Sequence, residues 1–383
     1  MTTFLAAIGD SNDPSTWSGI PYHILQQARK QGLIQVGLPL SVTSAGWWRR
    51  RLVWNICSVM SGRGTGGFQY SVGFLERLWR PFHELIVRHR VINCFQLFPP
   101  SIVSNANVER WYFLDQTLHQ LFDQYGVRTS IGRRIADDAI DRERIGYEAA
   151  AGIVMHSRWA ANSVIRDYGI DPSKVFVVVP GANIDTNAAR HWSAIRETSS
   201  SGSRSSLQLV FVGKDPHRKG LDRLLRAYAI VRGQGLDCKL RIIGCTREGI
   251  AQEIGDLPGI EWLGFVDKRD DPYRYVTLVG DCDIGCLLSR AEAGGIGLRE
   301  FHSLGLAVIG PDVGGSPDHV LPGAATLVSP IESDEEVATL ISEFVADRDR
   351  VRLMRTLSWQ NREEMSWDTS IRRLSAIMGL KCE

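Results

Sequence analysis

The strongest constraint on the fold of this chain is a repeated alternation of short apolar runs with helical patterns in its second half. The apolar runs are 207–212, 239–243, 260–263, 283–288 and 307–310. Between the first two, apolar residues from Leu221 to Val231 recur at intervals of three and four, as on one face of an α-helix. Strands that alternate with helices indicate βαβ units, and therefore a parallel sheet with helices on both faces.

The first half shows the same alternation, with a strand at 4–8, a helix near 21–31, and apolar runs at 91–95, 111–114, 152–156 and 175–179. Between the halves, residues rich in Ser, Arg and Ala have the composition of a linker. We therefore predict two Rossmann-like α/β domains that face each other across a cleft. The predicted division is an N-terminal domain at 1–186, a linker at 187–206, a C-terminal domain at 207–362, and a helix at 363–383 that either closes its own domain or crosses back to the first.

Charge and hydropathy exclude several classes of protein. The 383 residues carry 44 Lys and Arg against 43 Asp and Glu, so no global positive field favours nucleic acid. No apolar run approaches the about 20 residues that span a bilayer, and the first residues lack the pattern of a signal peptide, so we expect a cytoplasmic protein. The seven cysteines are odd in number and scattered. We interpret Cys282 and Cys286 as reduced core residues rather than metal ligands.

A glycine-rich segment follows the fourth apolar run and leads into a short helical pattern. Gly294 and Gly295 precede this helix, whose free N–H groups and dipole favour a phosphate. Glu292 and Glu300 flank the segment, and carboxylates beside a phosphate repel it unless they point at sugar hydroxyls. The pattern therefore favours recognition of a polyol, with simple capping of the helix as the alternative.

A basic turn follows the first apolar run. Lys214 and Lys219 stand five residues apart around Pro216. Two ammonium groups that converge on a turn suit a diphosphate. The alternative is a solvated basic loop.

Together these two segments resemble the nucleotide-sugar site of the retaining GT-B glycosyltransferases of glycosyltransferase family 4. The family pattern of two glutamates separated by seven residues is matched by Glu292 and Glu300, and its basic positions by Lys214 and Lys219. This chain departs from the family at Phe301 and His302, where small residues are usual. Further segments that resemble the family are 17–23, 156–170, 179–183 and 312–318.

The resemblance implies a role for each matched residue. Lys214 and Lys219 would neutralise the diphosphate as it leaves, Glu300 would bind the ribose, and Glu292 would bind the transferred sugar. It implies no metal cofactor, because cations and helix termini replace Mg²⁺ at the leaving group. The remaining donor contacts implied are the backbone N–H groups of Gly294, Gly295 and Ile296, the close approach allowed by Gly19, and a contact of Val266 with the base.

The acceptor side is predicted from the first half. Asp115 ends a strand-like run and is a candidate to orient or deprotonate the acceptor hydroxyl, with capping of the next helix as the alternative. The resemblance implies no protein nucleophile. His119 and His156 are interpreted as structural.

A tryptophan- and arginine-rich stretch, Trp47, Trp48, Arg49, Arg50 and Arg51, suits a peripheral contact with the inner face of a membrane. The alternative is a partly buried helix whose arginines reach water.

The resulting prediction is a retaining hexosyltransferase. It would use a nucleotide diphosphate sugar as donor and a hydroxyl of a saccharide or lipid-linked glycan as acceptor, in polysaccharide or glycoconjugate biosynthesis. The alternatives are a sugar-nucleotide epimerase of the same fold and a non-catalytic protein that binds nucleotide sugars.

Overall fold

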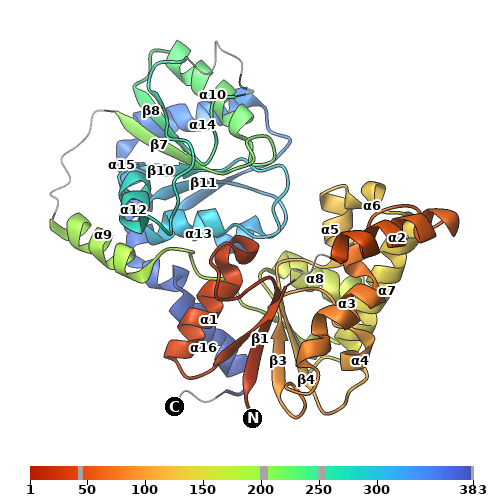
Figure 1. Ribbon diagram of the computed structural model, residues 1–383. Helices are drawn as coiled ribbons and strands as arrows, with labels where there is room; N and C mark the ends of the chain where they lie inside the picture. Colours follow the sequence, from red (N-terminus) through yellow and green to blue (C-terminus); the bar gives the residue numbers. More distant parts are fainter. Residues whose placement is uncertain (42–45, 199–205, 249, 251–255, 381–383) are drawn as a thin grey trace. The chain divides into compact units, whose positions relative to one another are not determined.

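The computed structural model describes residues 1–41, 46–198, 206–248, 250 and 256–380 (Figure 1). The chain divides into two compact units. Unit 1 consists of Met1–Val179 and Ser370–Glu383, and unit 2 of Pro180–Thr369. Each unit holds one six-stranded sheet in which every neighbouring pair of strands is parallel. The predicted α/β class with two parallel-sheet domains is therefore confirmed.

The sheet of unit 1 has the strand order β2-β1-β3-β4-β5-β6. Figure 1 shows α1 and α16 on one side of this sheet and α3, α4 and α7 on the other. The strands are β1 (Thr3–Ile8), β2 (Val36–Leu40), β3 (Arg90–Asn93), β4 (Glu109–Leu114), β5 (Gly152–Met155) and β6 (Val175–Val177). The helices are α1 (Ile20–Lys30), α2 (Trp47–Met60), α3 (Val72–Trp79), α4 (Pro100–Val103), α5 (Leu118–Gln124), α6 (Val127–Ser130), α7 (Arg133–Glu148), α8 (Arg158–Arg166) and α16 (Trp367–Ile377), with short 3-10 turns η1 (Thr16–Gly19), η2 (Phe68–Tyr70), η3 (Arg80–Phe82) and η4 (Pro172–Lys174).

The sheet of unit 2 has the strand order β12-β11-β10-β7-β8-β9. In Figure 1, α10 and α14 cover one face, and α12, α13 and α15 cover the other. The strands are β7 (Leu207–Val212), β8 (Cys238–Ile243), β9 (Ile260–Trp262), β10 (Ile284–Cys286), β11 (Ala307–Pro311) and β12 (Ala325–Val328). The helices are α9 (Thr186–Thr198), α10 (Leu221–Gly233), α12 (Pro272–Gly280), α13 (Ile296–Ser303), α14 (Asp334–Ala346) and α15 (Arg348–Gln360), with 3-10 turns η5 (Ser316–His319) and η6 (Arg362–Met365).

The predicted strands are confirmed to within two residues, but β2 and β12 were not predicted. Both are edge strands. The sequence of β2 contains Gly37 and Pro39, which weaken a strand pattern; proline is tolerated at an edge because only one side of the strand needs its N–H groups. The two strands that the apolar pattern did not predict, β2 and β12, are therefore both edge strands.

The predicted linker at 187–206 is wrong over its first part, because Thr186–Thr198 forms α9. Ala188 and Trp192, four residues apart, are buried in the core of unit 2. The Trp192 indole N–H donates to the Leu304 carbonyl at 3.2 Å. Arg190, Ser193 and Arg196, which contributed to the linker composition, stand on this helix, whose buried apolar positions are few. Residues 199–205 lie outside the described residues.

The predicted C-terminal helix at 363–383 is shorter in the structure. The turn η6 ends at Met365, Ser366 is extended, and α16 then runs to Ile377. The indole N–H of Trp367 donates to Asn183 Oδ1 at 2.8 Å within unit 2. Ser370 Oγ donates to the Val179 carbonyl at 2.8 Å within unit 1. The helix therefore starts in unit 2 and ends in unit 1.

A buried carboxyl group ties together the helices around the end of β4. Glu143 on α7 is fully buried and accepts hydrogen bonds from the Tyr147 hydroxyl at 2.6 Å and from the Tyr168 hydroxyl. It also accepts from the backbone N–H of Leu118, the first residue of α5, at 2.9 Å. Burial outweighs these hydrogen bonds and raises the pKa of Glu143 to about 8.

This pKa makes the stability of the protein depend on pH. Because the folded-state pKa lies above the ordinary value of 4.5, the stabilising contribution is complete below about pH 4.5 and is lost as the pH rises through about 8. Glu143→Gln removes this titration. We expect the free energy of unfolding of the variant, relative to wild type, to increase from pH 5 to pH 8, as measured by urea unfolding. A constant Glu143→Gln difference across this range would contradict the assignment.

Candidate active site

The strand order of unit 2 reverses direction between β7 and β10, the two central strands. From β7 the chain runs outward to β8 and β9, and from β10 it runs the other way to β11 and β12. In open α/β sheets, ligands bind beyond the carboxyl ends of the strands at such a reversal. The loops that leave β7 and β10 there carry Lys214 and Lys219 in one case and Glu292 in the other. The topology thus explains why the basic loop after β7 and the acidic loop after β10, which are far apart in sequence, come together.

Lys219 and Glu292 form an ion pair across these two loops. Arg218 lies 3.6 Å from the same carboxylate oxygen, and the buried Ser289 hydroxyl donates to it at 3.3 Å. Both partners of the ion pair are largely buried, with side-chain exposures of 17% and 13%. The negative charge of Glu292 is therefore already balanced by cations, which allows a carboxylate to stand at an anion site.

Backbone contacts hold the two loops together beside this pair. The Leu288 N–H donates to the Lys219 carbonyl at 3.2 Å, and the Arg290 N–H donates to the Arg218 carbonyl at 2.8 Å. Gly220 has a left-handed conformation with φ of 74°, and a Cβ there would overlap the Leu288 carbonyl oxygen. Only glycine fits this close approach.

The predicted helix after the glycine-rich segment is α13, which begins at Ile296. Gly294 and Gly295 pack against His319, so that a Cβ on Gly294 would come within 3.2 Å of its ring. Among the described residues, no side chain caps the start of α13. Its first N–H groups are therefore available to an anion, as the pattern predicts.

Glu300 lies one turn into α13 and is buried. Lys268 Nζ donates to both of its carboxylate oxygens at 2.6 Å, and the Tyr275 hydroxyl donates to one of them at 2.6 Å. Burial, assisted by the charge of Glu300, raises the pKa of Tyr275 well above its usual value, so the hydroxyl keeps its proton. The alternative that Glu292 and Glu300 merely cap the helix is wrong, because their side chains bind Lys219 and Lys268 instead.

Sequence reasoning missed Lys268 and Tyr275. Lys268 stands only two residues after Val266, which the resemblance singled out, but it lies 32 residues from Glu300 in sequence. No local pattern relates residues at such a separation.

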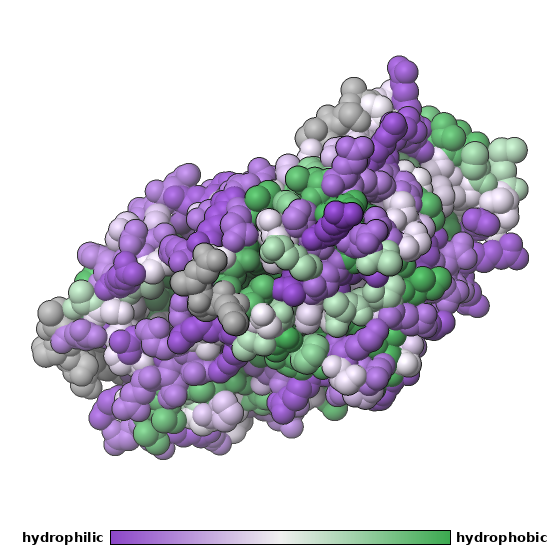
Figure 2. Space-filling model, turned by 90° about the horizontal axis from the view of Figure 1, so that it is seen from below, coloured by the Kyte–Doolittle hydropathy of each residue, from purple (hydrophilic) through white to green (hydrophobic). Residues whose placement is uncertain are grey.

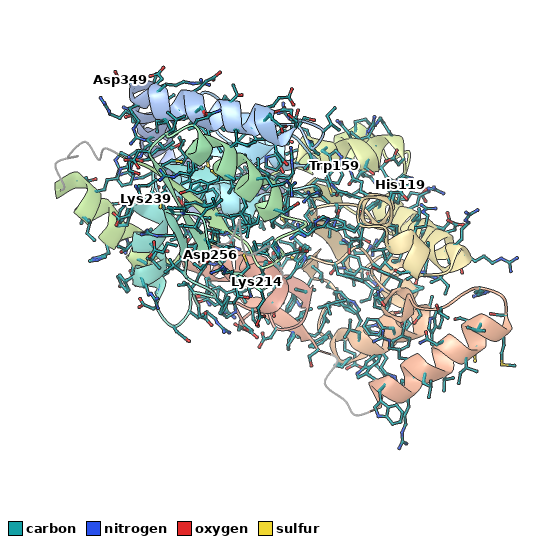
Figure 3. All side chains as sticks on the ribbon, turned by 90° about the horizontal axis from the view of Figure 1, so that it is seen from above. His119, Trp159, Lys214, Lys239, Asp256 and Asp349 are labelled. Carbon is teal, nitrogen blue, oxygen red and sulfur yellow. The ribbon has the colours of Figure 1, made fainter. Side chains whose placement is uncertain are left out.

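The structure describes Lys214 and Val266 without testing their predicted roles toward a donor. None of the ion pairs among the described residues joins Lys214 to Glu292; its ammonium group lies 4.5 Å from the centre of the Phe265 ring (Figure 3). The convergence of Lys214 and Lys219 on a diphosphate stays a prediction. Val266 is buried in the core of unit 2, and its contact with the base stays a prediction.

In unit 1, Gly19 stands in the loop between β1 and α1 with φ of 84°. The two residues before it, Trp17 and Ser18, are also left-handed, with φ of 44° and 57°. Such strain in residues other than glycine costs about 1–3 kcal/mol each and clusters at ligand sites. The strand order of unit 1 reverses between β1 and β3, and this loop leaves the carboxyl end of β1. Assignment of Gly19 to the donor site stays a prediction.

Asp115 follows β4 and is half-buried. The alternative that it caps the next helix is wrong, because Thr117 is the N-cap of α5 and forms a capping box with Gln120. Burial, together with the nearby charge of Asp115, raises the pKa of the Cys94 thiol, which places Asp115 near the end of β3. Its role toward an acceptor stays a prediction.

The histidines flanking these segments have structural partners. His156 is buried against the Phe113 ring, at 4.4 Å between centroids, and burial lowers its pKa to about 3. His119 lies 3.4 Å from Asp123 (Figure 3 labels His119 on α5). His302, which departs from the family pattern, accepts from the Leu321 N–H at 3.1 Å and contacts Ser358 Oγ at 2.8 Å. It ties α13 to α15.

Within the part of the chain that the structure describes, no group of three or more His, Cys, Asp or Glu side chains is placed to hold a metal ion. Cys282 and Cys286 are buried and belong to no disulfide of the described residues. No helix of the described residues is both long enough and apolar enough to cross a membrane.

The close approach of Gly220 to the Leu288 carbonyl predicts that one added methyl group strongly lowers the stability of the protein. Gly220→Ala should lower the free energy of unfolding by about 3 kcal/mol or more, because the left-handed backbone and the Leu288 carbonyl both oppose a Cβ. Gly233→Ala, at the end of α10, is the control: its Cβ would meet nothing within 4 Å, and we expect a gain of about 0.5–1 kcal/mol. Urea unfolding measures both. Equal effects of the two substitutions would show that the loop does not need glycine.

Comparison with known proteins agrees with this geometry. The family model described as Glycosyl transferases group 1 matches residues 197–360. The D-inositol 3-phosphate glycosyltransferase of Rhodococcus jostii is 25% identical over 224 residues, which are 56% of this chain and 49% of that protein. The chain therefore spans about half the length of the curated relatives that it matches.

Solved structures match over nearly the whole chain. WaaG, a glycosyltransferase involved in lipopolysaccharide biosynthesis, has a TM-score of 0.66 at 15% identity and covers 99% of this chain and 100% of its own. Anabaena HepE in complex with UDP-glucose has a TM-score of 0.63 at 14% identity, with coverage of 99% and 100%. The second half of the chain thus matches the group 1 glycosyl transferases, and the chain as a whole has the fold of GT-B glycosyltransferases.

Proposed function

We propose that this protein is a retaining glycosyltransferase that moves a hexose from a nucleotide diphosphate sugar to a hydroxyl of a saccharide or lipid-linked glycan. The observation that carries the proposal is the Lys219–Glu292 ion pair, which stands where the strand order of unit 2 reverses. The uncapped start of α13 is in the same loop region. A cation, a carboxylate and free N–H groups are the groups that a diphosphate joined to a sugar requires.

The comparisons support this donor class. One solved structure of the same fold holds UDP-glucose, and another is a glycosyltransferase of lipopolysaccharide biosynthesis. The family match covers the half of the chain that carries the two lysines and the two glutamates. The role of WaaG in lipopolysaccharide biosynthesis supports a glycoconjugate acceptor as part of the proposal.

The residues of unit 2 would act mainly on the leaving group. As the bond between the anomeric carbon and the diphosphate oxygen breaks, negative charge develops on the diphosphate. Lys219 and the N–H groups at the start of α13 are fixed before the reaction, so they stabilise this charge without reorganising. Lys214 would supply a second cation after moving from the Phe265 ring. Glu292, held by Lys219 and Ser289, would accept hydrogen bonds from the sugar hydroxyls.

Glu300 would accept hydrogen bonds from the ribose hydroxyls of the donor. Its two oxygens already bind Lys268 and Tyr275. These contacts hold the carboxylate in one orientation and leave one acceptor position, on Oε1, for the ribose. Lys268 would thus be a positioning residue for nucleotide binding.

On the acceptor side, the new bond would form between the acceptor oxygen and the anomeric carbon on the face that the diphosphate leaves. The acceptor's proton would go to a phosphate oxygen of the leaving group, so no protein nucleophile is needed. Asp115 would orient the acceptor hydroxyl. We further propose that the reaction needs no divalent metal, because Lys214, Lys219 and the helix terminus supply the positive charge.

One experiment separates this function from the alternatives. The purified protein is incubated in EDTA with a panel of nucleotide sugars, with and without saccharide and lipid-linked acceptors, and free nucleoside diphosphate is measured. We expect release that depends on the acceptor, with a product of unchanged anomeric configuration by NMR. Conversion of the donor without acceptor would identify an epimerase, and binding of the donor without any conversion would identify a binding protein. Activity restored only by Mg²⁺ would overturn the proposal of metal independence.

Substitution of Glu292 and substitution of Glu300 should have different effects on donor binding and transfer. Glu300→Ala should weaken binding of the nucleoside diphosphate alone by at least about 10-fold, because a charged hydrogen bond contributes about 1.5–3 kcal/mol. Glu292→Ala should leave this affinity nearly unchanged and lower the rate of transfer, because its partner is the sugar. Calorimetry measures the affinities. Since Glu300→Ala leaves Lys268 without its partner, Tyr275→Phe, which keeps the charge pair, serves as a milder second variant. Equal losses of nucleotide affinity for Glu292→Ala and Glu300→Ala would contradict the assignment.

A further inference from the structure

Helix α2 is anchored to unit 1 by one face. Trp47 packs on the rings of Phe68 and Phe74, with centroid distances of 6.0 and 5.0 Å. The Trp54 indole N–H donates to the Gly66 carbonyl at 2.8 Å, and Ser58 is buried. Trp47 is therefore partly buried and holds the helix in place, and its part in the predicted membrane contact stays a prediction.

The opposite face of α2 is apolar and faces water. Its six residues, here called the α2 apolar face, are each at least half exposed: Trp48 62%, Leu52 51%, Val53 58%, Ile56 50%, Val59 56% and Met60 82%. Four of them recur every fourth residue and so form one line along the helix. Figure 2 shows an apolar cluster at upper right, at the end of the view where α2 lies. A helix on the surface of a soluble domain normally turns polar residues outward, so a contiguous apolar face marks an interaction surface.

The sequence segment that contains α2 is basic. Residues 14–75 contain no Asp or Glu, whereas Arg29, Lys30, Arg49, Arg50, Arg51 and Arg63 all fall within them. The whole chain, in contrast, is balanced to a net charge of +1. Arg49, Arg50 and Arg51 are exposed at the start of α2 itself. The α2 apolar face thus shares its own helix with three exposed arginines, whereas Arg63, beyond the end of the helix, lies 3.8 Å from Asp138 of α7.

The positive charge on α2 distinguishes between two partners, a second copy of this chain and a lipid surface. A second copy of this chain would bring two such basic segments together, and like charges across an interface oppose association. A lipid surface with anionic headgroups offers negative charge to the arginines and an apolar layer to the side chains below them. With 14 residues, α2 is about 21 Å long, which suits a helix that lies in the plane of the interface rather than one that crosses it.

We propose that the α2 apolar face docks unit 1 onto an anionic membrane surface, with Trp48, Leu52, Ile56, Val59 and Met60 inserted among the lipids and Arg49, Arg50 and Arg51 at the headgroups. Two signals act together in such binding, apolar insertion and charge, since neither alone gives stable attachment. The surface lies on a different unit from Lys219 and Glu292, so this inference does not depend on the donor chemistry.

The test is sedimentation of the full chain with vesicles of phosphatidylglycerol and phosphatidylcholine, and with vesicles of phosphatidylcholine alone, at low and at physiological salt. Wild type should bind the anionic vesicles, and binding should fall as salt rises. Replacing Arg49, Arg50 and Arg51 by Gln should weaken binding to anionic vesicles about 100-fold, because each arginine near such a surface contributes about fivefold.

The apolar part is tested by Ile56→Gln with Val59→Gln, which should weaken binding at least about 10-fold at either salt concentration, because buried apolar area is lost. The matched control is Ile331→Gln with Leu353→Gln, two apolar residues of unit 2 that are 92% and 62% exposed and should leave binding unchanged. All four side chains are exposed, so thermal unfolding should be the same for every variant.

The proposal is overturned if wild type does not bind anionic vesicles at low salt, or if the Ile56 and Val59 substitutions leave binding intact. Light scattering addresses a second copy of the chain. A dimer that these substitutions dissociate, in a protein that does not bind vesicles, would assign the face to self-association. Failure of vesicle binding would leave the proposed transferase function untouched, because release of nucleoside diphosphate is measured without a membrane.

Discussion

The reversal of strand order between β7 and β10 is the constraint on which the candidate active site depends. Because these two strands are neighbours in the sheet but lie about 70 residues apart in sequence, their loops meet only when the parallel sheet is complete. The Lys219–Glu292 ion pair and the backbone hydrogen bonds beside it then hold the loops together. Gly220 is needed at this junction for steric reasons alone. The chemistry of the site is thus a consequence of sheet topology.

Charge balance is the second principle of the site. Glu292 and Glu300 stand next to groups that bind anions, yet each has a lysine partner, Lys219 in one case and Lys268 in the other. The buried Glu143 of unit 1 solves a similar problem without a cation, through two tyrosine hydroxyls and a helix N–H, and its pKa rises instead. The two carboxylates of unit 2 thus have lysine partners, whereas Glu143 has only hydrogen-bond donors.

Unit 1 differs from unit 2 in what it presents to its surroundings. Its strained loop before α1 and the half-buried Asp115 stand at the carboxyl ends of its strands, as ligand groups do in such sheets. Its α2 helix exposes an apolar face within a stretch that has no acidic residue. The first of these features suits a small ligand and the second an extended surface, so one unit can serve two kinds of contact.

The sequence by itself determined the α/β class, most strands, and the two pairs of motif residues in unit 2, because apolar periodicity and short spacings are local properties. Only the tertiary structure decided that 186–198 is a helix, that edge strands β2 and β12 complete the sheets, and that Trp47 is an anchor while Leu52, Ile56 and Val59 face water. It also decided the partners of Glu292 and Glu300. Burial and pairing depend on which distant segments meet, and Lys268 lies 32 residues from the carboxylate that it holds, so no pattern along the chain could reveal them.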